Sequence, residues 1–135
     1  MYKLFMFICL TGITCPVILA ADMNKVPNKL LNAIEHVESN HRAYAVGDRG
    51  KAVGSFQIHP VTIQDVNRIV KYQKYKLSDR YNRDKSRAIC SVILWHYEKN
   101  KTPEAMARRW NGGTNWQSKP ATKAYWQKVR KEMSK

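Results

Sequence analysis

The sequence predicts a mainly α-helical chain that carries one small loop or β element. Its 135 residues, 44% of them hydrophobic, suffice for one domain with a single core of ordinary proportion. Apolar residues recur at helical spacing over most of the chain. Three of the six glycines fall within residues 47–54, where that spacing breaks. We therefore expect one helical domain whose irregular segment follows the first helix.

The N-terminal segment has the features of a secretory signal peptide. Lys3 precedes an apolar run, and the segment ends in the small residues Ala20 and Ala21. We expect cleavage after Ala20, so that residues 1–20 form the signal and residues 21–135 form the domain. A segment that stays in the bilayer as an anchor is the alternative. The sequence thus predicts a periplasmic or secreted protein that touches a membrane only through its signal segment.

The helices can be placed in order along the chain. The first predicted helix opens at Pro27, a residue that suits the first turn, and its apolar stripe is Leu30, Leu31, Ile34 and Val37. A loop follows, with one short extended piece at Ser55 to Ile58. The later predicted elements are helices at 60–69 and 84–98, a short helix capped by Thr102, a turn at 111–113 and a last helix at 120–129, with a tyrosine-rich connection over 71–82.

The cysteines and histidines argue against disulfides and metal centres. Once the signal is removed, Cys90 is the only cysteine, and its apolar neighbours indicate a buried side chain rather than a reactive thiol. His36, His41 and His96 show no metal-ligand spacing. We expect no metal and no cofactor.

The chain has a formal net charge of +14. Such a charge favours polyanionic partners, but the basic residues are spread over the whole length and form no nucleic-acid-binding motif. Because export is expected, the anionic polymers of the cell envelope are the predicted partners, while a role in solubility alone is the other interpretation. We expect no nucleic-acid partner and a monomeric protein.

Helical geometry distinguishes the two glutamates of the first helix. At about 100° per residue, the apolar stripe centres about 50° from Glu38 and roughly 100° or more from Glu35. Glu38 is therefore predicted to lean toward the core and Glu35 toward water. Burial and the negative end of the helix dipole both favour the neutral carboxyl group of Glu38 and raise its pKa. Such a group is suited to general acid catalysis at neutral pH.

Cleavage of a glycosidic bond needs an acid that protonates the leaving oxygen and a second group that satisfies the positive charge developing at the anomeric carbon. The second group is either a carboxylate or the substrate's own 6-hydroxyl, deprotonated by the same glutamate, which gives a 1,6-anhydro sugar. Asp48, in the glycine-rich loop, is the nearest acidic candidate. A turn residue that hydrogen-bonds its own backbone is the competing interpretation of Asp48.

Four short motifs occur in order along the chain, namely Glu38-Ser39, Gly54-Ser55-Phe56-Gln57-Ile58, Trp110-Asn111-Gly112-Gly113 and residues 122–129. They resemble the Glu-Ser, Gly-Leu-Met-Gln-Ile, Tyr-Asn-Ala-Gly and Thr-x-x-Tyr-Val motifs of the soluble (SLT) lytic transglycosylases and of their relatives, the goose-type lysozymes. The resemblance covers most of residues 21–135. It implies a lysozyme-like α(+β) domain with a small loop or β element beside the substrate cleft.

The resemblance also implies the substrate and the site. It implies cleavage of the β-1,4 MurNAc-GlcNAc bond of peptidoglycan glycan strands, with Glu38 as catalytic acid and base and with Tyr125 orienting it. Gly54 would let the backbone approach the glycan, Phe56 would offer an apolar face, and Gln57 would offer a donor and an acceptor. The implied substrate-binding residues are Ser39, Phe56, Gln57, Ile58, His59, Asn111 and Tyr125.

Two features of the glycine-rich loop leave the reaction type open. The stretch Gly47-Asp48-Arg49-Gly50 resembles the goose-type pattern, in which the aspartate helps to activate water, but His59 stands where the second goose-type aspartate is expected. His59 is also typical of a loop or cap residue before proline. We predict transglycosylation with Glu38 as the sole essential catalyst, and hydrolysis that uses Asp48 is the alternative. An inactive module that binds glycan in the same cleft is a third interpretation.

Overall fold

The computed structural model describes residues 25–135, so the expected signal peptide lies outside the described residues. Within this range the chain forms five α-helices and a small two-stranded sheet. The prediction of a mainly helical fold with a small β element is confirmed. The helices are α2 (Asn28–Ser39), α3 (Pro60–Val70), α4 (Arg83–Tyr97), α5 (Pro103–Gly112) and α6 (Ala121–Met133).

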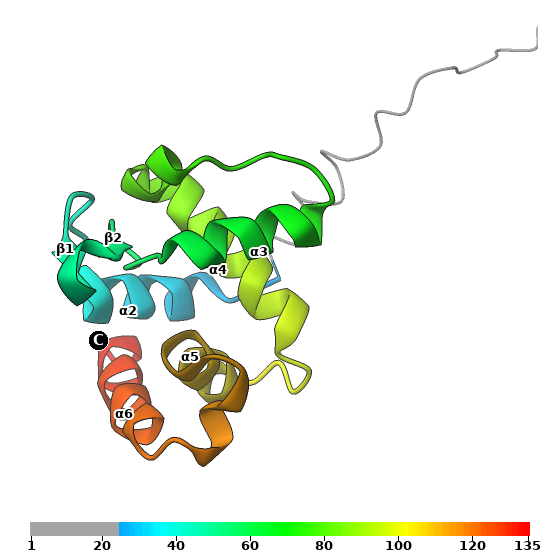
Figure 1. The fold of residues 1–135 in the computed structure, drawn as a ribbon. Helices are drawn as coiled ribbons and strands as arrows, with labels where there is room; N and C mark the ends of the chain where they lie inside the picture. Colours follow the sequence, from blue (N-terminus) through cyan, green and yellow to red (C-terminus); the bar gives the residue numbers. More distant parts are fainter. Residues whose placement is uncertain (1–24) are drawn as a thin grey trace, which may run out of the picture.

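Helix α2 runs through the middle of the molecule, with α3 and α4 on one side and α5 and α6 on the other (Figure 1). Its apolar stripe is fully covered, because Leu30 and Ile34 are both 0% exposed. Cys90 on α4 is equally buried in the same core, as the sequence predicts. The central position of α2 means that a side chain on its last turn can be reached from both groups of helices.

The helix ends follow from local chemistry. The side chain of Thr102 accepts a hydrogen bond from the backbone amide of Ala105 and caps α5, as the sequence predicts. The side chain of Asn82 caps α4 in the same way, by accepting from the Lys85 amide. Helix α2 ends at Asn40, whose backbone is left-handed with φ of 53°. This ending turns the chain sharply into the glycine-rich loop.

The loop folds into a short hairpin of β1 (Val46–Gly47) and β2 (Ala52–Val53), which pair antiparallel. The 3₁₀ turn η1 (Asp48–Gly50) joins the two strands. The extended piece predicted at Ser55 to Ile58 is wrong, because most of that segment is a turn and Ile58 makes only an isolated bridge to Val53. The strands form earlier in the chain, where the backbone can pair across the Asp48 turn.

Two further segments differ from the sequence prediction. The 71–82 connection contains a 3₁₀ helix, η2 (Leu77–Tyr81), and the expected turn at 111–113 is instead the end of α5 followed by a second 3₁₀ helix, η3 (Gly113–Ser118). None of the helices within residues 25–135 is both long and apolar enough to span a membrane.

Candidate active site

Glu38 lies on the last turn of α2, where the middle helix meets the C-terminal pair. The hydroxyl of Tyr125, on α6, donates a hydrogen bond to Glu38 Oε1 across 2.7 Å. The side chain of Trp110, on α5, hydrogen-bonds the same carboxyl group. The Tyr125 side chain is buried, with 8% of the residue exposed. The carboxyl group is thus held by donors from two different helices.

The surroundings of Glu38 favour its neutral form. Burial is the largest influence and raises its pKa, while the hydrogen bonds from Tyr125 and Trp110 lower it in part, leaving a pKa of about 7. Burial and the adjacent Glu38 carboxyl group likewise raise the pKa of the Tyr125 hydroxyl well above its ordinary value, so it remains a proton donor. A carboxyl group that titrates near neutrality can both give and take a proton at physiological pH.

Glu38 opens into a cleft of about 890 Å³. The cleft runs between the hairpin, α3, the C-terminal end of α4 and the end of α5, and its side chains are mixed polar and apolar. It is lined by Glu38, Asp48, Ala52, Gln57, His59, Val61, Thr62, Gln64, Asp65, Arg68, Ile93, Tyr97, Arg109, Trp110, Asn111, Gly113 and Thr114. The cleft thus offers hydrogen-bonding groups and apolar surface side by side, as a sugar-binding site requires.

Asp48 in the hairpin and His59 at the start of α3 lie side by side in the lining of this cleft. Nε2 of His59 lies 3.4 Å from Oδ2 of Asp48, and the two side chains are 40% and 56% exposed. The backbone of Asp48 is left-handed, with φ of 45°, which a turn of this shape requires. Asp48 therefore forms the turn and also lines the cleft.

Gln57 and Asn111 also line the cleft. Nε2 of Gln57 donates to the carbonyl oxygens of Gly54 at 3.0 Å and Ala45 at 3.3 Å. The amide nitrogen thus fastens the hairpin, and only the side-chain oxygen remains for a ligand. Gly47 leaves the space that this side chain occupies, because a Cβ there would meet Gln57 Oε1 at 2.3 Å.

Four residues implied as substrate contacts do not line the cleft, namely Ser39, Phe56, Ile58 and Tyr125. Phe56 is 0% exposed and Ile58 is 1% exposed, so both belong to the core beneath the hairpin and offer no apolar face to a sugar. Ser39 is 4% exposed, and its hydroxyl donates to the carbonyl oxygen of Ser55 at 2.8 Å. Ser39, Phe56 and Ile58 fix the hairpin on α2. The side chains of Phe56 and Ile58 are buried beneath it, and the Ser39 hydroxyl satisfies a backbone carbonyl group of the loop.

Tyr125, the remaining implied contact, meets Glu38 rather than the cleft surface. The role expected of Gly54 also changes. Its φ is +82°, and a Cβ would lie 1.8 Å from the carbonyl oxygen of Arg80. The close backbone approach at Gly54 is therefore to η2 and not to the glycan.

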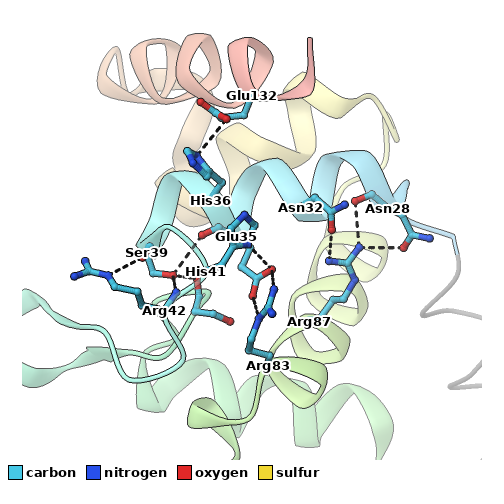
Figure 2. A network of polar contacts seen from close by, with 11 residues as sticks. Asn28, Asn32, Glu35, His36, Ser39, His41, Arg42, Arg83, Arg87 and Glu132 are labelled. Atoms are coloured by element: carbon cyan, nitrogen blue, oxygen red, sulfur yellow. Dashed lines mark hydrogen bonds and ion pairs between the residues drawn. The ribbon is translucent and has the colours of Figure 1, made fainter. Parts of the chain in front are cut away.

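Glu35 is the clearest departure from the helical-wheel prediction, which turned it toward water. It is 2% exposed, and Arg83 at the start of α4 binds both of its carboxylate oxygens, at 2.7 and 2.9 Å (Figure 2). Nδ1 of His41 lies 3.0 Å from Oε2. Burial raises the pKa of Glu35, but the hydrogen bonds from Arg83 and His41 outweigh it and bring the pKa to about 2. Glu35 is thus charged at neutral pH and joins α2 to the start of α4.

Further polar contacts join α2 to α6 and to α4. Nδ1 of His36 lies 3.3 Å from a carboxylate oxygen of Glu132 on α6, and Arg87 on α4 donates to the side chains of Asn28 and Asn32 (Figure 2). Polar contacts to α4 and α6 therefore hold α2, and with it Glu38, from two directions.

Several cleft residues were missed from the sequence. Trp110 belongs to one of the four motifs, and its contact with Glu38 was not anticipated. Asp65 accepts a hydrogen bond from the hydroxyl of Tyr97 at 2.7 Å and from Arg68 at 2.5 Å. The guanidinium of Arg109 lies over the ring of Tyr97, 5.2 Å from its centroid. The only available signal was the Asp65-Arg68 spacing on one helix face, which is also typical of an ordinary solvated pair.

Within the described range, no group of three or more His, Cys, Asp or Glu side chains is arranged to hold a metal ion. What the site does contain is one carboxyl group that titrates near pH 7, an exposed Asp48 in the same lining and a cleft of about 890 Å³ in a lysozyme-like α(+β) fold. Together these features define a glycan-cleaving type of site.

The comparisons with known proteins place the chain in a family. The family model described as the transglycosylase SLT domain matches residues 16–133. Because this match spans most of the chain, the protein belongs to the transglycosylase SLT domain family. Members of this family are lytic transglycosylases, and the protein is accordingly an enzyme that cleaves glycosidic bonds of peptidoglycan. No curated protein and no solved structure matched the chain.

Proposed function

We propose that Glu38 is the single catalytic acid and base of this enzyme and that its product is a 1,6-anhydroMurNAc end. In the first step the neutral carboxyl group of Glu38 gives its proton to the oxygen of the MurNAc-GlcNAc bond while the bond from that oxygen to C1 of MurNAc breaks. The GlcNAc side leaves with a free 4-hydroxyl, and positive charge develops at C1.

In the second step the Glu38 carboxylate takes the proton from the 6-hydroxyl of the same MurNAc residue. The oxygen of that hydroxyl then bonds to C1 and closes the anhydro ring, and Glu38 returns to its neutral form. No water is consumed, so the masses of the two products sum to that of the substrate. One carboxyl group serves both steps, because the first step leaves Glu38 as the carboxylate that the second step needs, and the second step restores its neutral form.

The observation that carries this proposal is the state of Glu38. Its pKa of about 7 leaves a substantial neutral fraction at physiological pH, and Tyr125 holds it at the wall of the cleft. An ordinary glutamate, ionised at pH 7, has little proton to donate. A binding module has no use for a half-buried acid that titrates near pH 7, so the same observation argues against the inactive interpretation.

Hydrolysis with Asp48 remains the second candidate, because Asp48 lines the same cleft as Glu38 and has an exposed carboxylate. In that reaction Asp48 would activate a water molecule, and the water would attack C1 in place of the 6-hydroxyl. The contact with His59 and the turn conformation account for Asp48 without catalysis, which favours transglycosylation.

The test is mass spectrometry of the soluble fragments that the protein, without its signal segment, releases from purified peptidoglycan, beside Glu38→Gln and Asp48→Asn. Transglycosylation predicts anhydro ends from the unchanged protein and from Asp48→Asn, and loss of release in Glu38→Gln. Reducing ends that carry one added water, lost in Asp48→Asn, would instead establish hydrolysis. Binding without any release by the unchanged protein would leave the inactive module as the better account.

The setting of the reaction is also a proposal. An exported, monomeric enzyme with a net charge of +14 would be concentrated on the anionic polymers of the envelope by charge alone. Cosedimentation with intact walls at increasing salt tests this idea, because electrostatic retention falls steeply with ionic strength while recognition of the uncharged glycan does not.

A further inference from the structure

A second hollow, of about 540 Å³, lies on the other flank of α3 from the catalytic cleft. It is bounded by α3 and by the chain that follows α3, which turns back along the helix before η2 (Figure 1). Asn67 pins the two segments together: its Nδ2 donates to the carbonyl oxygen of Tyr75 at 2.8 Å, and its Oδ1 accepts from the Tyr75 amide at 2.9 Å. The hollow therefore has fixed walls.

The two hollows meet at one place on α3. Gln64 and Arg68 line both of them, and these two exposed residues stand one turn apart on the helix. They form a saddle that separates the catalytic cleft from the second hollow. A ligand that branches within the cleft can therefore send one arm across Gln64 and Arg68 into the second hollow while its main chain stays beside Glu38.

The chemistry of the second hollow differs from that of the cleft. Its floor contains the buried side chains of Ile63 and Tyr75, and its rim contains Tyr72 and Leu77, which are 39% and 53% exposed. Its lining residues include two cations, Arg68 and Lys71, and no acidic residue. By contrast, the cleft lining includes Glu38, Asp48 and Asp65.

Lys71 is the cation that distinguishes this hollow. Its side chain is exposed and makes no ion pair within residues 25–135, whereas Arg68 is already paired with Asp65. The backbone of Lys71 is left-handed, with φ of 63°, because it caps the C-terminus of α3. The ammonium group is thus available for an anionic group of a ligand in this hollow.

We infer that the second hollow binds the stem peptide of peptidoglycan while the glycan occupies the cleft; this inference rests on the proposed function. Peptidoglycan is a branched polymer, since each MurNAc residue carries a short peptide on its lactyl group. That peptide has apolar side chains and free carboxylates, which match an apolar floor and a lining that holds two cations and no acidic residue. The saddle at Gln64 and Arg68 lies where the branch leaves the glycan. The enzyme accordingly prefers peptide-bearing strands to bare glycan.

The experiment compares kcat/KM for one preparation of glycan strands before and after an amidase has removed the stem peptides. Lys71→Asn and Lys71→Asp remove and reverse the charge, and both residues tolerate the left-handed backbone. Lys128→Asp is the matched control, because Lys128 is exposed on α6 and lines neither hollow. The unchanged protein should prefer peptide-bearing strands. Lys71→Asn should reduce that preference roughly two- to five-fold, as one exposed charge pair does, and Lys71→Asp should reduce it further.

Equal kcat/KM on both strand types in the unchanged protein, or the same preference in the Lys71 variants as in Lys128→Asp, would overturn the inference. An equal loss on bare strands in the Lys71 variants would place glycan in the second hollow and also overturn it. A second measurement does not depend on cleavage: titration of Glu38→Gln with the isolated stem peptide should shift the amide NMR signals of Lys71, Tyr72 and Leu77.

The two proposals fail separately. If the unchanged protein cleaves neither strand type, the proposed function is wrong, and the NMR titration alone decides whether the peptide binds. If anhydro ends form equally well from both strand types and the titration leaves those signals in place, the proposed function stands and the peptide site is rejected.

Discussion

The hydroxyl of Tyr125 donates a hydrogen bond to Glu38 across 2.7 Å, although the two residues stand 87 positions apart in the sequence. This single contact joins the last helix, α6, to the end of the middle helix, α2. It holds the carboxylate oxygen Oε1 in place. The contact also stabilises the charged form of Glu38 and so opposes the effect of burial on its pKa.

Tyr125→Phe removes this donor and keeps the ring. We expect the pKa of Glu38 to rise above about 7, so that the alkaline loss of activity moves to higher pH, because Glu38 must be protonated to act as the acid. We also expect kcat to fall more than KM rises, since Tyr125 meets Glu38 and not the cleft. A pH profile of kcat against peptidoglycan measures both effects. An unchanged alkaline limb would show that Tyr125 does not act through Glu38.

Glu38→Gln should stabilise the protein at alkaline pH while it abolishes activity. The carboxyl group has a pKa of about 7 when folded and 4.5 when unfolded, so the folded state binds more protons between these values. The stability of the unchanged protein therefore falls as pH rises from about 4.5 to about 7, by about 3 kcal/mol in total. The glutamine variant lacks this loss. Urea unfolding of both proteins at pH 4 and pH 8 should show an advantage for the variant only at pH 8.

Glu35→Gln should destabilise the protein at neutral pH. The pKa of Glu35 is about 2 when folded against 4.5 when unfolded, so its contribution is fully present above about pH 4.5 and is lost as pH falls through about 2. We expect a loss of about 1–3 kcal/mol at pH 7, because Arg83 and His41 lose a buried charged partner. Urea unfolding across this pH range measures it.

The control for that experiment is Glu104→Gln. The Glu104 side chain is 50% exposed in its pair with Arg108, so we expect a loss of at most about 0.5 kcal/mol. Equal losses in the two variants would show that the Glu35 contact has no special weight.

Gly54→Ala should destabilise the hairpin and lower activity with it. The position has φ of +82°, and the new methyl group would meet the carbonyl oxygen of Arg80 at 1.8 Å. Gly50→Ala is the matched control, because its φ is +89° but nothing lies within 4 Å of the added atom. Thermal unfolding should therefore show a cost of about 1 kcal/mol for Gly50→Ala and a clearly larger one for Gly54→Ala. Equal costs would mean that η2 moves aside freely.

Residue patterns predicted the helices well. Pro27, Thr102 and Pro120 stand next to the three helix starts that they were expected to mark, because capping and proline geometry act over a few residues. The prediction failed in the glycine-rich loop, where the strands form at Val46–Gly47 and Ala52–Val53 instead of at Ser55 to Ile58. The conformation of such a loop depends on the surface against which it packs. The spacing of residues within the loop does not reveal that surface.

The sequence likewise predicted some features of the active site and missed others. The spacing of the apolar stripe on α2 indicated an inward-leaning Glu38 with a raised pKa, and the structure gives it a pKa of about 7. The same spacing turned Glu35 outward, yet Glu35 is buried, because Arg83 stands 48 positions further on and neutralises it. Phe56 was expected in the cleft by its place in a motif and lies in the core.

By itself, then, the sequence determined the helical class, the family resemblance and the glutamate suited to acid catalysis, since each depends on residue types at short spacing. Only the tertiary structure decided that the neighbouring Glu35 is buried and charged. Burial raises the pKa of any carboxyl group, and the outcome turns on whether a distant chain segment brings a hydroxyl, as Tyr125 does to Glu38, or a guanidinium, as Arg83 does to Glu35. Such partners come from folding and not from local sequence.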